Sequence, residues 1–184
     1  MTAIDLLKQQ HDEVDRLFKD LEKASDANER KRLFGELARN LVAHDAIERE
    51  IFYPACEKYM GMIEPLAEAL TEHGLVEFSL YQADQAQGKT SFEAKLAVLK
   101  EVVTHHVKEE ENTLFPKVRK AIGDEVLENI GFDLDERFEE VKVEDFRAGL
   151  YDTLLQVMEG ALKTGSKKRH VQRRGNGGRH TATR

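Results

Sequence analysis

The sequence predicts an all-α fold, an up-down-up-down four-helix bundle with an additional C-terminal helix. Apolar residues recur at steps of three or four along four long segments, which is the period of an amphipathic helix. Glycine (12) and proline (3) are scarce among the 184 residues, so the chain lacks the turn signals of a multi-stranded β protein. Four such helices joined by short turns are typical of a bundle.

The bounds of the first two helices follow from their caps and turns. Thr2 can cap the first helix together with Asp5, three residues further on. A polar turn at 25–28 separates this helix from the second, which we expect to run from about Glu29 to the region of Pro54. The stripe of the first helix comprises Ile4, Leu7, His11, Val14 and Phe18.

The third and fourth helices complete the predicted bundle. Gly61 and Pro65 mark the break before the third helix, and Gly88 lies in the loop before the fourth. The third helix carries His73 on its apolar stripe, and the fourth carries His106.

An internal repeat is the strongest signal in the chain. Residues 37–54 read LARNLVAHDAIEREIFYP, and residues 99–116 read LKEVVTHHVKEEENTLFP. Aligned without a gap at an offset of 62 residues, both segments have a histidine, a glutamate four residues later and a proline at the end. The same offset, carried backwards, pairs one further histidine in each half. The matched pairs are His11 with His73, His44 with His106, Glu48 with Glu110, and Pro54 with Pro116.

These polar residues share the phase of the apolar stripes, so a folded bundle buries them. Leu37 and Leu41 continue at helical steps into His44 and Glu48, and the antiparallel return of the chain brings His11 within about two turns of His44. Buried imidazoles and carboxylates without partners are costly, and six at one level need a cation. Two metal ions would satisfy them, and these donors suit iron, manganese or zinc.

A single His-x-x-x-Glu pair is weak evidence, because helices rich in glutamate produce it readily. His105 with Glu109 has this spacing, one residue out of phase. We favour His106 with Glu110, since this pair lies on the Leu99 stripe and obeys the repeat. His105 is expected to be exposed or in contact with a ligand residue.

The blocks HDEVDRLF, HDAIEREIFYP, EHGLVEF and HHVKEEENTLFP resemble the hemerythrin-like, HHE cation-binding domain family over about residues 1–120. The resemblance implies a four-helix bundle with two non-haem iron ions, bridged by carboxylates and an oxo or hydroxo ligand. The ligands that it implies, by position in this chain, are His11, His44, Glu48, His73, His106 and Glu110.

Two departures argue against reversible oxygen carriage. Oxygen-carrying hemerythrins have a further histidine four residues after the third ligand histidine, where this chain has Glu77. Glu77 is either a seventh metal ligand or an acid on the helix face. The carriers also end with an aspartate five residues after the last histidine, whereas Glu110 follows His106 by four. Asp15, which matches Glu77 in the first repeat, is expected at the surface.

The chain divides into three predicted regions: a di-metal-binding bundle over 1–122, a helical extension over 123–162 and a disordered basic tail over 163–184. Gly131 suggests a broken or short helix at the start of the extension, and 144–162 reads as a fifth helix. The tail carries eight Lys/Arg and no Asp/Glu, which leaves 20 basic and 35 acidic residues in the rest of the chain.

The predicted function is a non-haem di-iron protein that binds or reacts with dioxygen, nitric oxide or peroxide, for sensing or scavenging. One alternative is a non-catalytic iron-responsive or iron-buffering module that signals through its C-terminal helix. A second is an interaction protein acting through the basic tail. The tail has no aromatic residues, so nucleic acid is the less favoured partner. No nucleophile elbow, Walker loop or Rossmann fingerprint is present, so enzymatic activity would have to come from the metals.

The remaining expectations concern location. No apolar run approaches 18 residues, and acids interrupt the N-terminal segment, so we expect neither a membrane span nor a signal peptide. The single cysteine, Cys56, fits a reducing cytoplasm. The sequence leaves the oligomeric state open.

Overall fold

The computed structural model describes residues 1–158, and within this range all regular structure is helical. The expectation of an all-α fold is therefore confirmed for this part of the chain. The predicted tail over 163–184 lies outside the described residues. The α-helices are α1 (Ala3–Lys23), α2 (Ala27–Ile47), α3 (Tyr53–Met60), α4 (Glu64–Asp84), α5 (Phe92–Glu109), α6 (Phe115–Ala121), α7 (Asp124–Lys142) and α8 (Phe146–Met158), and two π-helical turns are η1 (Glu48–Phe52) and η2 (Glu110–Leu114).

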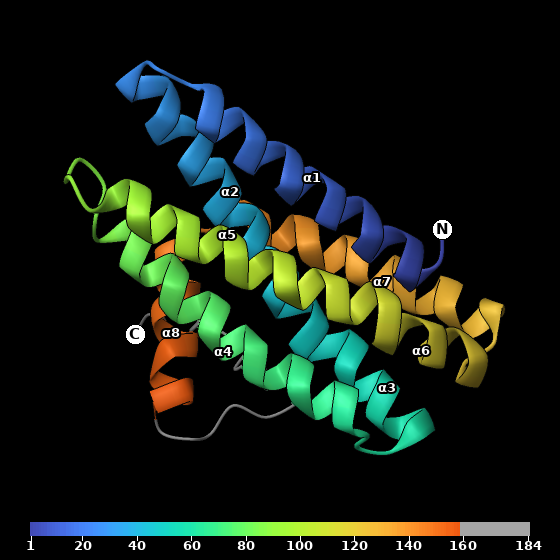
Figure 1. Cartoon of the computed structure of the whole chain (residues 1–184). Helices are drawn as coiled ribbons and strands as arrows, with labels where there is room; N and C mark the ends of the chain where they lie inside the picture. The colour runs from blue at the N-terminus through green and yellow to red at the C-terminus, as the bar shows by residue number, and fades with distance from the viewer. Residues whose placement is uncertain (159–184) are drawn as a thin grey trace, which may run out of the picture.

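Two helical hairpins hold the centre of the molecule, α1 with α2 and α4 with α5 (Figure 1). The first hairpin starts behind Thr2, whose hydroxyl oxygen accepts from the Asp5 N–H, as the sequence predicts. Asp26 caps α2 by accepting from two N–H groups of its first turn. α7 packs against α1 and α2, and α8 packs against α4 and α2.

The second long helix does not end near Pro54 as the sequence suggests. Pro54 has no N–H, and its ring would clash with the carbonyl four residues back. The helix widens instead into η1, where the Tyr53 N–H bonds to the Glu48 carbonyl five residues back. It then continues as α3 to Met60 and stops at Gly61, which has a positive φ of 71°.

The repeat reproduces this turn in the second half of the chain. η2 begins at Glu110 and precedes Pro116, and the Phe115 N–H bonds to the Glu110 carbonyl. A π-helical turn therefore begins at each predicted ligand glutamate. Each π-helical turn rotates the side chains after its glutamate away from the directions that they would have in a continuous α-helix.

The predicted break at Gly131 is wrong, because α7 runs through this residue without interruption. The glycine serves packing instead. A Cβ atom at Gly131 would lie 2.6 Å from the Met1 carbonyl oxygen and 2.9 Å from the Ala3 nitrogen. The absence of a side chain thus allows α7 to pack against the backbone that leads into α1.

The apolar core forms two clusters, one on each side of the predicted ligand residues. One cluster surrounds Leu37, Leu80 and Leu99, and it includes the apolar face of α8. The other surrounds Leu7, Ile47 and the α7 side chains. The histidines and glutamates form a polar layer between these clusters. No described helix is long and apolar enough to cross a membrane.

Candidate metal centre

The six residues that the sequence selects converge in this polar layer. All six are buried, and their exposed fractions range from 0% to 7%. The ring nitrogens Nε2 of His11 and His44 are 3.2 Å apart, and those of His73 and His106 are 3.1 Å apart. Each hairpin therefore brings its two histidines to one level, as the antiparallel arrangement predicts.

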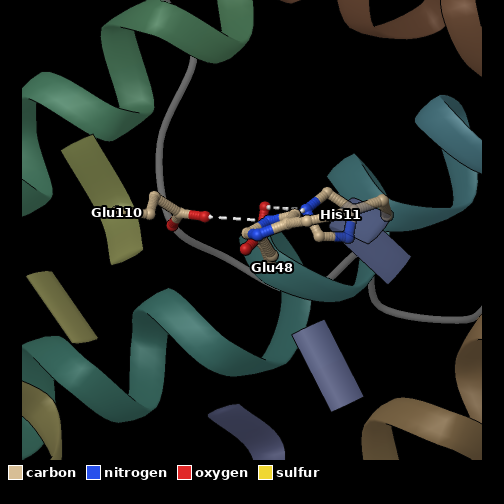
Figure 2. A group of neighbouring side chains, drawn as sticks. His11, Glu48 and Glu110 are labelled. Carbon is tan, nitrogen blue, oxygen red and sulfur yellow. Dashed lines mark hydrogen bonds and ion pairs between the residues drawn. The ribbon is translucent and has the colours of Figure 1, made fainter. Parts of the chain in front are cut away.

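The two glutamates each reach both hairpins. Glu48 Oε2 lies 3.2 Å from Nε2 of His44 and 3.1 Å from Nε2 of His73. Glu110 Oε2 lies 3.4 Å from Nε2 of His11 and 3.6 Å from Nε2 of His106. Figure 2 shows the Glu110 carboxylate pointing toward the His11 ring.

Donor atoms close enough to share a metal ion form two groups among the described residues. One group contains two histidines and both glutamates, and the other contains the remaining two histidines with Glu48. Glu48 belongs to both groups, which is the position of a bridging carboxylate. The groups are His11, His44, Glu48 and Glu110, and Glu48, His73 and His106.

Each of the four imidazoles also makes a hydrogen bond through Nδ1, the ring nitrogen that faces away from the centre. Each Nδ1 faces a side-chain oxygen that accepts a hydrogen bond, so Nδ1 carries a proton and Nε2 is the nitrogen that faces the centre. Hydrogen bonds of this kind fix the orientation of metal-binding histidines. The pairs are His11 with Glu111 (2.9 Å), His44 with Gln10 (2.8 Å), His73 with Asp45 (2.6 Å) and His106 with Glu72 (3.0 Å).

The charges in the layer are strongly coupled in the metal-free protein. Burial opposes a charge on His11, but the nearby carboxylates of Glu110 and Glu111 raise its pKa to about 9. Burial likewise opposes a charge on His73, whose pKa the carboxylates of Asp45 and Glu48 raise to about 10. Burial works against ionisation of Glu48 as well, yet the neighbouring histidines hold its pKa well below the ordinary value. In the metal-free protein, the protons on His11 and His73 therefore supply positive charge beside the carboxylates, as a metal ion would.

The unpaired atoms show that this set of residues fits a metal ion. Glu48 Oε1 and Glu110 Oε2 are buried and have no hydrogen-bond partner. Unsatisfied carboxylate oxygens at such depth cost free energy. Two divalent ions would satisfy these oxygens and replace the protons on the imidazoles.

Tyr53 is a member of the centre that the sequence analysis missed. Its side chain is 0% exposed, and its hydroxyl lies 2.9 Å from Glu110 Oε1 and 2.8 Å from Nε2 of His73. Burial, followed by the charges of Glu110 and Glu48, raises its pKa well above the ordinary value, so the phenol keeps its proton.

The π-helical turn explains why the periodicity hid this residue. In an α-helix, a side chain five positions after Glu48 would point well away from it. The i to i−5 bond of η1 brings Tyr53 back to the face of Glu48. Its repeat partner Phe115 takes the matching place and stacks on the His11 ring at 5.9 Å. The shared position in the repeat was the one signal that could have drawn attention to Tyr53.

Glu77 is not part of either group of converging donors. It is 2% exposed, and its Oε2 has no hydrogen-bond partner. Burial, and then the charge of Asp45, raises its pKa well above the ordinary value, so the carboxyl is neutral. A role for Glu77 as a seventh ligand stays a prediction. Asp15 is exposed and paired with Lys19.

His105 is exposed, as predicted, and its contact is with Glu72, which is not one of the predicted ligands. Its side chain is 63% exposed, and its Nε2 lies 3.1 Å from Glu72, the residue that accepts from His106. It therefore contacts the surroundings of the centre from the solvent side.

A small cavity of about 20 Å³ adjoins the centre. The four histidines and Asp45 form its polar side. Its other walls are aliphatic, and its volume is roughly that needed for one water molecule. The aliphatic residues are Val14, Leu41, Val76, Val103 and Val107.

Comparisons with known proteins agree with this geometry. Residues 2–118 match the model of the hemerythrin HHE cation binding domain. A solved hemerythrin HHE cation binding domain-containing protein from Mycobacterium kansasii, a homologue of Rv2633c, is 26% identical with a TM-score of 0.69, covering 88% of this chain and 94% of that one. A protein of Nostoc sp. named DNA nickase is 27% identical over 129 residues, which are 70% of this chain. The match spans only 36% of that relative's length.

Proposed function

We propose that this chain, which belongs to the hemerythrin HHE cation-binding domain family, is a non-haem di-iron protein that binds or reacts with a small oxidant. The oxidant is dioxygen, nitric oxide or peroxide, and the role is sensing or scavenging. In this proposal α1, α2, α4 and α5 act as the metal-binding bundle of residues 1–122. Residues 123–158 form a helical extension of it, and the remaining positions of the predicted extension, 159–162, lie outside the described residues.

The observation that carries the proposal is the convergence in a buried layer of four Nε2 atoms and two carboxylates, each with one oxygen that has no hydrogen-bond partner. Each glutamate reaches one histidine of each hairpin, which supports two ions bridged by Glu48 and Glu110. Imidazole and carboxylate donors suit iron, and manganese or zinc could occupy the same positions.

The residues around the ions would control what reaches them. Iron held here would supply the electrons and the open coordination positions that a small oxidant needs. The cavity beside the centre, at about 20 Å³, has room only for a very small molecule. The Tyr53 hydroxyl can donate a hydrogen bond toward Glu110 and so hold that carboxylate in place.

Metal analysis and spectroscopy test the proposal directly. Protein purified without added metal, or reconstituted with ferrous iron, should carry two iron ions per chain. Its visible spectrum should change on exposure to oxygen, nitric oxide or peroxide. Glu48→Gln should lower the iron content, because it removes the charge shared by both groups, whereas Glu109→Gln, next to Glu110 but outside both groups, should retain it. A loaded protein whose spectrum responds to none of the three oxidants would refute the proposal.

The name of the Nostoc relative, DNA nickase, refers to DNA cleavage. We do not propose this activity for the present chain. The residues before the predicted tail carry 20 basic and 35 acidic side chains, a balance that disfavours binding to phosphate backbones. Incubation of the metal-loaded protein with supercoiled plasmid checks this point. We expect the plasmid to remain supercoiled.

A further inference from the structure

The outward hydrogen bonds of the imidazoles differ between the two halves of the centre. Two of the four bonds follow the 62-residue repeat, but those of His11 and His73 do not. His11 donates to Glu111, which follows a ligand glutamate, whereas His73 donates to Asp45, which follows a ligand histidine. The repeat places Val107 where Asp45 stands, so the second half has no equivalent acid.

The acceptor of His11 is open to solvent. The Glu111 side chain is 29% exposed, and it pairs with Lys8 at 3.4 Å, whose own side chain is 45% exposed. Water can satisfy the remaining oxygen lone pairs, so an exposed pair of this kind contributes little. The hydrogen bond that holds His11 therefore does not depend on a buried partner of Glu111.

The acceptor of His73 is closed in and depends on other residues. The Asp45 side chain is 7% exposed, and the Arg49 side chain, at 12%, covers it. Arg49 Nε lies 3.0 and 2.8 Å from the two carboxylate oxygens, and Nη2 lies 2.8 Å from Oδ2. Such a fork fixes the plane of the carboxylate and thereby the direction of the bond to His73.

The chain of contacts ends on α8. Arg49 Nη2 also donates to the hydroxyl oxygen of Thr153 at 3.0 Å, and Thr153 is buried in α8. α8 is anchored independently of this contact: Leu150 and Leu154 enter the apolar core, and Arg147 pairs with the buried Asp84 of α4.

We propose that Arg49 and Thr153 are positioning residues through which the docked helix α8 holds the His73 half of the metal centre. Asp45, fixed by Arg49, sets the orientation of the His73 ring, and Thr153 sets the position of the guanidinium. The ion at Glu48, His73 and His106 is therefore retained more tightly when α8 is docked. The proposal rests on the metal binding proposed above, but not on a reaction with oxidants.

Zinc serves as the probe, because it fits the same donors and allows nuclear magnetic resonance. The full chain, loaded with zinc, is mixed with excess chelator, and release of the two ions is followed in time. Thr153→Val, which replaces the hydroxyl with a methyl group of similar size, should speed release of one ion about tenfold and leave the other unchanged. Nitrogen-15 histidine spectra should show faster exchange of the His73 Nδ1 proton, with that of His11 unaffected.

Three variants serve as controls. Thr153→Ser keeps the hydroxyl and should restore the wild-type release rate. Tyr151→Phe, on the same helix, removes an exposed contact to Gln85 at 3.2 Å and should leave both ions unaffected. Lys8→Ala removes the exposed partner in the other half and should also have no effect.

The outcomes separate this proposal from the proposed function. Zinc release that is unchanged in Thr153→Val, or accelerated equally for both ions, would overturn the positioning role while leaving metal binding intact. A wild-type chain that takes up neither zinc nor iron would overturn both proposals. Single-ion acceleration with rescue by serine would support the link from α8 to His73.

Discussion

At the level of single residues, the site consists of hydrogen-bonded pairs, each a histidine of the centre with an acceptor outside it. The Nε2 atom of each histidine faces the centre because its Nδ1 atom donates outward to Gln10, Asp45, Glu72 or Glu111. Three of these four acceptors are carboxylates, and those of Glu111 and Asp45 favour a charge on His11 and His73. The predicted ligands are thus oriented without a metal ion, which would lower the cost of binding one.

Tyr53→Phe tests the contribution of the buried phenol. Phenylalanine is the residue at the matching repeat position, so the ring shape should be tolerated. Loss of the hydroxyl leaves Glu110 Oε1 without its donor in a fully buried site. We expect the free energy of unfolding of the metal-free protein to fall by about 1–3 kcal/mol, measured by denaturant titration.

Tyr59→Phe is the matched control for this substitution. Tyr59 is 45% exposed, so removal of its hydroxyl should change the unfolding free energy by no more than about 0.5 kcal/mol. Equal effects of the two substitutions would show that the Tyr53 hydroxyl contributes nothing specific to the layer.

The π-helical turns are what distinguish these helices, as elements, from ordinary amphipathic ones. Both begin at a predicted ligand glutamate and end just before an aromatic residue followed by proline. The proline enforces the wider turn, and the wider turn brings the aromatic ring onto the same face as the glutamate. The two rings, Tyr53 and Phe115, then pack against the histidines of opposite hairpins.

Packing of α7 provides a second test at this scale. Gly131→Ala adds a methyl group 2.6 Å from the Met1 carbonyl oxygen, so the start of α1 or the whole of α7 must move. We expect a loss of about 1–3 kcal/mol in unfolding free energy despite the better helix propensity of alanine. Thermal or denaturant unfolding measures this loss.

Gly35→Ala is the comparison within another helix. A Cβ atom at Gly35 would meet only the end of the Arg39 side chain, at 3.6 Å. Alanine in this position should stabilise the protein by about 0.5–1 kcal/mol. Opposite signs for the two glycines would support the packing argument, and stabilisation at both positions would contradict it.

In the proposed di-metal protein, protons and metal ions would compete for the centre, and the stability of the whole molecule would depend on which of them is bound. The raised pKa values of His11 and His73, about 9 and 10, mean that both rings are charged at neutral pH when no metal is bound. Their contribution to the stability of the metal-free fold is fully present below pH 6.5, the ordinary value for histidine. It is lost as the pH rises through 9 to 10.

Metal binding should therefore release protons. At pH 7, loading with a divalent metal should free one proton from each of these two histidines, and affinity should rise with pH until about 9 to 10. Calorimetry in two buffers of different ionisation enthalpy counts the protons. His105→Gln should give the same count, since this ring lies outside the centre. Binding without proton release would contradict the proposed charge state.

The sequence by itself determined the helical class and the six residues of the centre. The repeat and the apolar phase are local and periodic properties, and they select His106 over His105 and Glu110 over Glu109. The same periodicity, assumed to be α-helical throughout, misplaced the end of the second helix and passed over Tyr53. One π-helical turn, enforced by Pro54, accounts for both errors.

Only the tertiary structure decided the surroundings of that centre. Each residue that accepts from an imidazole Nδ1 is adjacent in sequence to another residue of the centre, on a different helical segment from the histidine that it holds. Gly131 permits a helix contact where a break was expected. A chain of contacts links His73 through Asp45 and Arg49 to Thr153. Its last step, from Arg49 to Thr153, joins residues 104 positions apart in the sequence. Contacts of this kind depend on how helices dock, which no periodicity within one helix records.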